Sequence, residues 1–340
     1  MAEVRRTGKK ILLFVLLVSL VAAGIVEPYF QNEVYHYQDG GVRDSLAGTL
    51  DVLVCGSSHA YRGIVPEVLD ETLGCRAYNL STTRMTLAGQ YELLKAELAR
   101  NPVELVILEV SFDSMTRDRT QEGPEGDIYQ LGRYRNPLTR LSYFFRHIRV
   151  NEYLSVFYDT LYRGVEAWKA LAAGTGERGT SQNYQTKGWK PGDAAPCAVL
   201  DPQYYHTTCL ETQFRRENVN YLEKMVALCR DRGISVVAVT LPISQRLTLM
   251  YDGLDEIYTG YQDLFRRLEV PYVDFNLLRG KTALFPDESA FLDVNHLAED
   301  GAREFTAMMC RWINQDEQAF YASYAQAEAE ALAGRDFPAS

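Results

Sequence analysis

The sequence predicts an α/β fold built on a parallel β-sheet. Short and nearly continuous apolar runs at 51–56, 105–110 and 234–240 are typical of strands that are covered on both faces. Segments with apolar residues at helical spacing lie between such runs, as over 86–100. Glycine or proline ends several of these segments, which indicates turns between strands and helices. This alternation is typical of α/β domains.

We expect five strands, connected by helices. Right-handed crossovers place consecutive parallel strands side by side, so the carboxyl ends of the strands share one edge of the sheet, where ligands bind in open α/β folds. The expected strands span 51–56, 76–80, 105–110, 234–240 and 270–274, and the expected helices span about 64–73, 86–100, 214–231, 253–268 and 305–313.

Length and charge limit the possible functions. A chain of 340 residues can form one domain of about 250 residues with appendages. Its net charge of −10 argues against nonspecific nucleic-acid binding, which requires a basic surface. The sequence contains no zinc-type cysteine pairs, P-loop or dinucleotide glycine motif, which weakens metal, nucleotide and redox functions.

The N-terminus has the pattern of a membrane signal. Four basic residues within 5–10 precede the uncharged, apolar run 11–26. This pattern predicts a signal-anchor helix within 1–30, with its basic flank in the cytoplasm, followed by a stalk over 31–50. The protein would then be a single-pass protein of the cytoplasmic membrane with its main domain outside. A signal peptide cleaved near Gly24 is the alternative.

The main domain is expected over 51–314, with an insertion at about 112–212 and a helical tail over 315–340. Five arginines lie between Arg133 and Arg149, interleaved with aromatic residues. One interpretation is an amphipathic helix that packs its aromatic residues and solvates its arginines. The other is a lid or collar that meets an anionic polymer or lipid headgroups.

Two of the six cysteines, Cys197 and Cys209, lie in the polar insertion. In an exported protein they could close a short loop, and such a disulfide contributes about 3 kcal/mol. The other four cysteines lie in apolar contexts and are expected to be buried thiols.

Two distant stretches carry residues for nucleophilic catalysis. Gly56, Ser57 and Ser58 follow the first strand, while Asp293 and His296 lie three residues apart before the last core helix. A serine hydroxyl needs a base to remove its proton, and a histidine base needs an acceptor to orient its ring. We therefore expect Ser58 as nucleophile, His296 as base and Asp293 as its partner, with Ser57 as an alternative nucleophile.

Further residues could complete this site. A tetrahedral oxyanion requires hydrogen-bond donors. The backbone N–H groups of Ser58 and Ser81 and the side chain of Asn79 lie in loops at strand ends. Arg84 is a candidate contact for the acceptor. His59 is a poor base for its neighbour Ser58, because adjacent side chains diverge.

These residues resemble the sequence blocks of the SGNH (GDSL-type) hydrolase superfamily, and more closely its membrane-anchored cell-envelope branch. That branch includes proteins of teichoic acid D-alanylation and of polysaccharide O-acetylation. The resemblance covers roughly 48–111 and 214–314. Its first, second and last blocks correspond to Gly56-Ser57-Ser58, Tyr78-Asn79-Leu80-Ser81 and Asp293-Val294-Asn295-His296.

The chain departs from the family pattern at two places. Ser81 stands where the family commonly has a glycine oxyanion donor. The usual Gly-x-Asn-Asp of the third block is absent, and the chain reads Glu109-Val110-Ser111-Phe112-Asp113. The asparagine donor of that block therefore has no clear counterpart. This argues against efficient hydrolysis and favours an inert module, but it is compatible with slow acyl transfer to a positioned acceptor.

The resemblance implies a flavodoxin-like, three-layer α/β/α sandwich and an exported serine acyltransferase or esterase. The implied substrate is a cell-envelope glycan or a teichoic-acid-like polymer. A multi-spanning membrane O-acyltransferase is an implied partner, and no metal or organic cofactor is implied. Two alternatives remain: a catalytically inert module that binds polymer and scaffolds an envelope complex, and a simple carbohydrate esterase.

Overall fold

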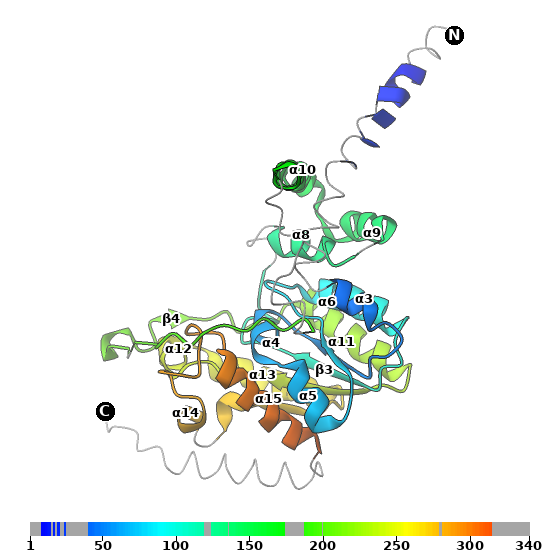
Figure 1. Cartoon of the computed structure of the whole chain (residues 1–340). Coiled ribbons are helices and arrows are strands. Elements are labelled where there is room, and N and C mark those ends of the chain that lie inside the picture. The colour runs from blue at the N-terminus through cyan, green and yellow to red at the C-terminus, as the bar shows by residue number, and fades with distance from the viewer. Residues whose placement is uncertain are drawn as a thin grey trace. The chain divides into compact units, whose positions relative to one another are not determined.

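The computed structural model forms two compact units, and each is described by itself (Figure 1). One unit comprises Met1–Gly41 and Pro124–Tyr184, and the other comprises Val42–Gly123 and Gln185–Ser340. The structure describes residues 8–14, 16–17, 19–20, 24, 40–118, 124–134, 136–173, 187–198, 200–278 and 281–314.

The larger unit contains a five-stranded sheet in which all neighbouring strands are parallel. The strand order is β2-β1-β3-β5-β7, which corresponds to the doubly wound order 2-1-3-4-5. The predicted α/β class and its five parallel strands are confirmed. The strands are β1 (Val52–Cys55), β2 (Ala77–Asn79), β3 (Leu105–Glu109), β5 (Ser235–Thr240) and β7 (Tyr272–Asp274).

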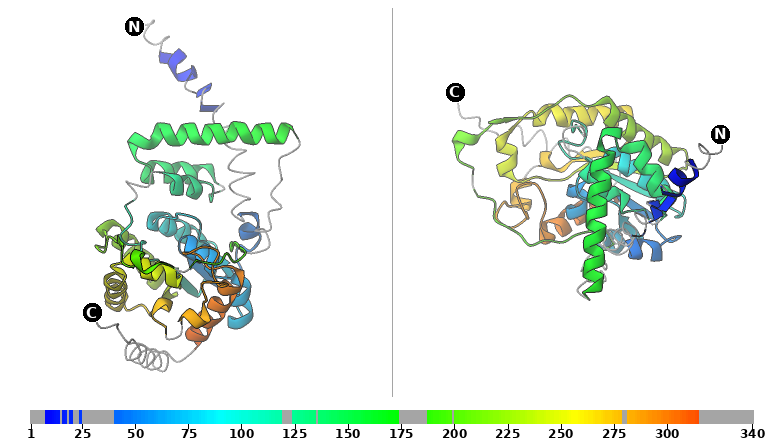
Figure 2. Two further views of the ribbon diagram at one scale, coloured as in Figure 1. Left: turned by 90° about the vertical axis from the view of Figure 1, so that its left-hand side faces the viewer. Right: turned by 90° about the horizontal axis from the view of Figure 1, so that it is seen from above.

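Helices cover both faces of this sheet (Figures 1 and 2). One face packs against α4 (Ser58–Gly63), α5 (Pro66–Leu73) and α15 (Glu299–Asn314). The other packs against α6 (Leu87–Leu98) and α11 (Arg216–Arg230), which meet through the rings of Tyr91 and Tyr221. Further elements of this unit are α3 (Gly40–Ser45), η4 (Pro202–Tyr204), α12 (Gln245–Met250), α13 (Leu254–Arg267), η5 (Phe275–Leu277), α14 (Lys281–Leu284) and a small sheet of β4 (Thr208–Cys209) and β6 (Tyr251–Asp252).

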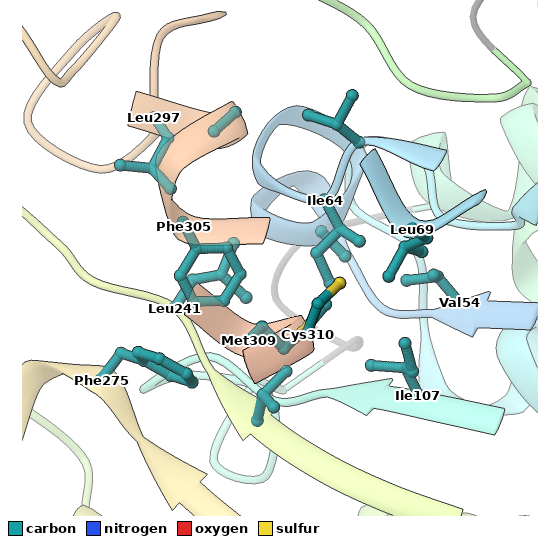
Figure 3. Packing of buried hydrophobic residues seen from close by; sticks show 14 of the residues in the cluster. Val54, Ile64, Leu69, Ile107, Leu241, Phe275, Leu297, Phe305, Met309 and Cys310 are labelled. Atoms are coloured by element: carbon teal, nitrogen blue, oxygen red, sulfur yellow. The ribbon is translucent and has the colours of Figure 1, made fainter. Parts of the chain in front are cut away.

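The alternation of side chains along the strands explains the two-sided core. Val54 and Ile107 lie in one cluster with Leu69 of α5 and Phe305 of α15 (Figure 3). Leu53, one residue from Val54, is equally buried but lies outside this cluster, because successive strand side chains point to opposite faces. The continuous apolar runs of the sequence therefore reflect a sheet that is covered by helices on both faces.

One predicted helix is divided in two. The sequence pattern predicts a helix starting near residue 64, whereas α4 already begins at Ser58 and α5 begins at Pro66. Proline disfavours helical backbone in the preceding residue, and Val65 is extended (φ −99°, ψ 108°). Gly74 then ends α5 in left-handed backbone (φ 66°).

The smaller unit contains α8 (Glu125–Leu131), α9 (Pro137–His147), η2 (Val150–Glu152) and α10 (Tyr153–Ala172). Arg140 is buried and its Nε donates to the Tyr134 carbonyl at 3.0 Å, while the Tyr143 hydroxyl donates to Asp127 at 2.7 Å. The expectation that the arginines of this region are solvated is therefore wrong for Arg140. It is also wrong for Arg133, which is buried, whereas Arg146 is exposed.

Among the residues that the structure describes, no helix combines the length and hydropathy needed to cross a membrane. Much of the predicted anchor, residues 31–39 of the stalk and the tail lie outside the described residues. All six cysteines are free, so the structure lacks the disulfide considered for Cys197 and Cys209.

Candidate active site

Ser58 is positioned by a tight turn between β1 and α4. The strand ends at Cys55, and Ser58 is the first residue of the helix. Gly56 lies between them against the end of β3, where a Cβ atom would come 2.4 Å from Glu109 Oε2 and 2.7 Å from the Ala60 Cβ. Glycine is required here because the backbone approaches a neighbouring side chain too closely for any other residue.

The two serines of this turn have different environments. Ser57 is buried, and Glu109 Oε2 accepts its backbone N–H at 2.7 Å and its hydroxyl at 3.3 Å. Ser58 is only half-buried, and its Oγ lies 2.9 Å from His296 Nε2. The structure therefore pairs Ser58, and not Ser57, with the histidine.

Asp293 and His296 are held in a short closed loop. The loop is bounded by an antiparallel bridge between Phe291 and Leu297, and the Leu292 N–H donates to the His296 carbonyl at 2.8 Å. Asp293 Oδ1 accepts the backbone N–H of Asn295 at 2.8 Å and that of His296 at 2.9 Å. The carboxylate is thereby fixed beside the imidazole by its own local turn.

The three side chains form a continuous hydrogen-bonded relay. His296 Nδ1 lies 2.9 Å from Asp293 Oδ2 and 3.0 Å from Oδ1, and its Nε2 lies 2.9 Å from Ser58 Oγ. A carboxylate on Nδ1 places the ring proton there and leaves Nε2 to accept the serine proton. This arrangement can activate a serine for attack on an ester carbonyl.

Asp293 remains ionised over the ordinary pH range. Partial burial raises its pKa, but the hydrogen bond and charge of His296 and two backbone N–H donors outweigh burial and lower the pKa from 3.8 to about 2. Because the folded-state pKa lies below the unfolded value, the carboxylate stabilises the fold above about pH 4, and this contribution is lost as the pH falls towards 2.

We therefore expect the Asp293→Asn variant to be less stable than the parent chain at neutral pH, with a difference that narrows between about pH 4 and about pH 2. Urea unfolding of both proteins at several pH values measures this difference. A constant difference across that interval would contradict the lowered pKa of Asp293. In the pH–rate profile of the parent, no ionisation above about pH 4 should belong to Asp293.

Two of the three expected oxyanion donors are used within the fold. The Asn79 amide donates to the carbonyls of Ala60 and Ile64 at 2.8 and 2.9 Å, and its Oδ1 accepts the Ser81 N–H at 3.0 Å. The expectation that Asn79 and Ser81 donate into the site is therefore not met. Asn79 instead ties the end of β2 to α4, the helix that carries Ser58. Across the described residues, the Ser58 N–H alone of these three donors makes no hydrogen bond.

His59 packs against His296 and Glu109. Its position next to Ser58 in the sequence did not indicate these contacts. Its buried ring is 5.2 Å from that of His296, and its Nδ1 lies 3.6 Å from Glu109 Oε1. Burial lowers the pKa of His59, but its interactions with Glu109 and Asp113 outweigh burial and raise it. Arg84 is exposed in the loop after β2, in left-handed backbone with φ 52°.

In the described ranges, no group of three or more histidine, cysteine, aspartate or glutamate side chains is placed to hold a metal ion. The relay of Ser58, His296 and Asp293 provides a proton path from Ser58 Oγ to His296 Nε2.

A protein-family model matches residues 206–318, less than half of the chain. No curated protein matches the chain. Similar solved structures include a protein described as a lipolytic protein of the G-D-S-L family from Desulfitobacterium hafniense (11% identity, 77% of this chain and 98% of that chain, TM-score 0.37). Another is the M. smegmatis aryl esterase, at 12% identity over 78% of this chain and 98% of that chain, with a TM-score of 0.32. A third is a carbohydrate acetylesterase from Sinorhizobium meliloti, at 11% identity over 78% of this chain and 98% of that chain, with a TM-score of 0.36. At these identities and scores the likeness does not identify the family.

Proposed function

We propose that the protein is an SGNH-type serine acyltransferase or esterase, anchored in the cytoplasmic membrane and acting on acyl esters of cell-envelope glycans on the extracytoplasmic side. The observation that carries this proposal is the relay of Ser58, His296 and Asp293, whose successive contacts are 2.9 Å each. Ser58 and His296, 238 positions apart in the chain, meet there, and with Asp293 they supply the nucleophile, the base and the group that orients the base in acyl transfer.

The reaction would proceed in two steps through an acyl-serine. Ser58 Oγ attacks the carbonyl carbon of the donor ester while His296 Nε2 takes the hydroxyl proton. The carbonyl oxygen becomes an oxyanion, towards which the Ser58 N–H is the available backbone donor. His296 returns the proton to the leaving oxygen as the ester bond breaks. In the second step a glycan hydroxyl, or water, gives its proton to His296 and takes the acyl group from Ser58, and His296 returns the proton to Ser58 Oγ as the acyl–serine bond breaks.

The environment of the serine is consistent with transfer to a positioned acceptor. Asn79 and the Ser81 N–H are occupied, so the oxyanion has fewer backbone and amide donors than in an efficient hydrolase. Fewer donors slow attack by water and by sugar alike, and a bound acceptor gains the advantage of proximity. A multi-spanning membrane O-acyltransferase is the proposed source of the acyl group.

Product analysis tests this assignment. The full chain is incubated with an aryl acetate, with and without a glycan acceptor, and both free acetate and glycan-bound acetate are measured. We expect glycan-bound acetate that disappears in the Ser58→Ala variant. Free acetate that is unaffected by the acceptor would identify a simple carbohydrate esterase instead.

A catalytically inert, polymer-binding scaffold is the second candidate. The internal use of the Asn79 and Ser81 donors favours it, because a site with fewer donors loses part of the oxyanion stabilisation, which is usually the largest contribution to acyl transfer. Polymer binding that is unchanged in the Ser58→Ala variant, together with no acyl transfer by the parent chain, is the result that would select this candidate.

A further inference from the structure

Helix α10 of the smaller unit carries an exposed apolar stripe. Exposed apolar residues recur there at intervals of three and four, which places them on one side of a helix. Val156, Thr160 and Gly164 are buried at intervals of four along a neighbouring side. The stripe consists of Leu154, Phe157, Tyr158, Tyr162, Val165 and Trp168, with Leu154 83% and Tyr158 71% exposed.

Helix α9 extends this stripe. Leu138, Leu141 and Phe145 are exposed on it at intervals of three and four. The ring of Phe145 lies 5.8 Å from that of Tyr153, the first residue of α10, so the exposed residues of α9 end beside the start of α10. We call these three residues and the α10 stripe the α9–α10 apolar face. Soluble monomers rarely expose contiguous apolar surface of this kind without a partner.

The end of α10 contacts the N-terminal apolar segment. Trp168 Nε1 donates to the Gly24 carbonyl at 3.1 Å, and Gly24 lies near the end of the apolar run 11–26. Leu12 and Leu17, which belong to the same run, are 70% and 59% exposed. The α9–α10 apolar face is therefore connected to the segment that the sequence predicts to enter the membrane.

The composition of the face matches the border of a bilayer. Tyrosine and tryptophan concentrate at the headgroup level of membranes, and Tyr158, Tyr162 and Trp168 are all exposed here. Arg146 is exposed on α9, where it can approach anionic headgroups, whereas the exposed Lys169 of α10 donates to Glu166 at 2.7 Å. A helix with one apolar and one charged side lies in the plane of the interface.

We propose that the α9–α10 apolar face lies in the interfacial layer of the membrane that holds the N-terminal segment. This proposal rests on the membrane attachment in the proposed function but not on catalysis. It gives the smaller unit a second contact with the bilayer. The occupant of the face is lipid, and a protein partner is the alternative that the experiment distinguishes.

Trp168 provides a site-specific reporter. The chain has three tryptophans, and Trp189 and Trp312 are 2% and 4% exposed, whereas Trp168 is 49% exposed. The full chain is reconstituted into phosphatidylcholine–phosphatidylglycerol vesicles, with and without bromine on the lipid chains near the headgroups. The difference in emission between the parent chain and the Trp168→Phe variant is the contribution of Trp168. We expect brominated lipid to quench most of this contribution. Absence of this quenching would overturn the proposal and leave a protein as the occupant.

Matched variants separate the face from the anchor. Leu141→Glu with Leu154→Glu adds two charges to the face, and Leu141→Phe with Leu154→Phe changes the same two exposed positions but keeps them apolar. The glutamate pair should abolish the quenching and the phenylalanine pair should preserve it. Equal effects of the two pairs would contradict the proposal. Alkaline carbonate extraction tests the N-terminal anchor separately. If carbonate releases a protein whose Trp168 emission was quenched by brominated lipid, the transmembrane anchor is rejected, whereas the membrane contact of the α9–α10 apolar face is retained.

Discussion

Replacing Ser58 or His296 by alanine is expected to lower acyl-transfer turnover by about three orders of magnitude or more, because each change removes one end of the relay. The combined variant should be little worse than either single variant, since the two groups act as a unit. Turnover is measured with an aryl acetate, and urea unfolding establishes that each variant is folded. Ser58 is only half-buried, so its truncation leaves no large cavity.

Ser57→Ala is the matched control for this experiment. It removes a hydroxyl that lies 3.3 Å from Glu109 Oε2 but leaves the shorter bond from the Ser57 N–H in place. We expect activity within about tenfold of the parent chain, a loss that corresponds to one modest hydrogen bond. If Ser57→Ala is inactive while Ser58→Ala retains turnover, the assignment of the nucleophile is wrong.

Gly56→Ala is expected to destabilise the larger unit by about 3 kcal/mol and to remove activity, because the new methyl group has no space. Its Cβ would lie 2.4 Å from Glu109 Oε2 and 2.7 Å from both the Glu109 and Ala60 Cβ atoms. Either the end of β3 or the start of α4 must move, and α4 carries Ser58. Urea unfolding and turnover of the same sample measure both effects.

Gly233→Ala provides a comparison at an open position. Nothing lies within 4 Å of a Cβ atom there, and only its left-handed backbone (φ 68°) opposes a side chain. This variant should lose about 1 kcal/mol of stability and keep its activity. A smaller stability loss for Gly56→Ala than for Gly233→Ala would contradict the close packing of the turn.

Much of the sheet could be predicted from sequence. A strand covered on both faces must be apolar at every position, and this requirement produced the runs that became β1, β3 and β5. The start of the first helix was predicted too late, because α4 is short and Pro66 separates it from α5. Helical periodicity is a weak signal in a helix of six residues.

The relay itself was also predictable, and its surroundings were not. Asp293 and His296 are close in sequence, and two serines follow a strand whose carboxyl end faces their loop. Residue types and order therefore indicated the relay, but only the structure distinguishes Ser58 from Ser57. The roles of Asn79 and Glu109 depend on contacts with distant backbone groups. No sequence pattern indicates which of its possible partners a buried amide or carboxylate will bind.

The burial of Arg140 illustrates the same limit. A run of arginines among aromatic residues predicts an amphipathic surface, yet Arg140 donates to a carbonyl at the end of the preceding segment and is 7% exposed. A buried guanidinium must find acceptors, and these are supplied by tertiary structure.

The most direct test of the central claim is covalent labelling of the full-length chain in detergent with a fluorophosphonate, followed by mass spectrometry of the peptides. This probe reacts with serines that an adjacent base activates. The relay predicts a single adduct at Ser58 that is absent in the His296→Ala variant and present in the Ser57→Ala variant. A well-folded chain that is not labelled, or an adduct at Ser58 that persists without His296, would contradict an activated serine at this site.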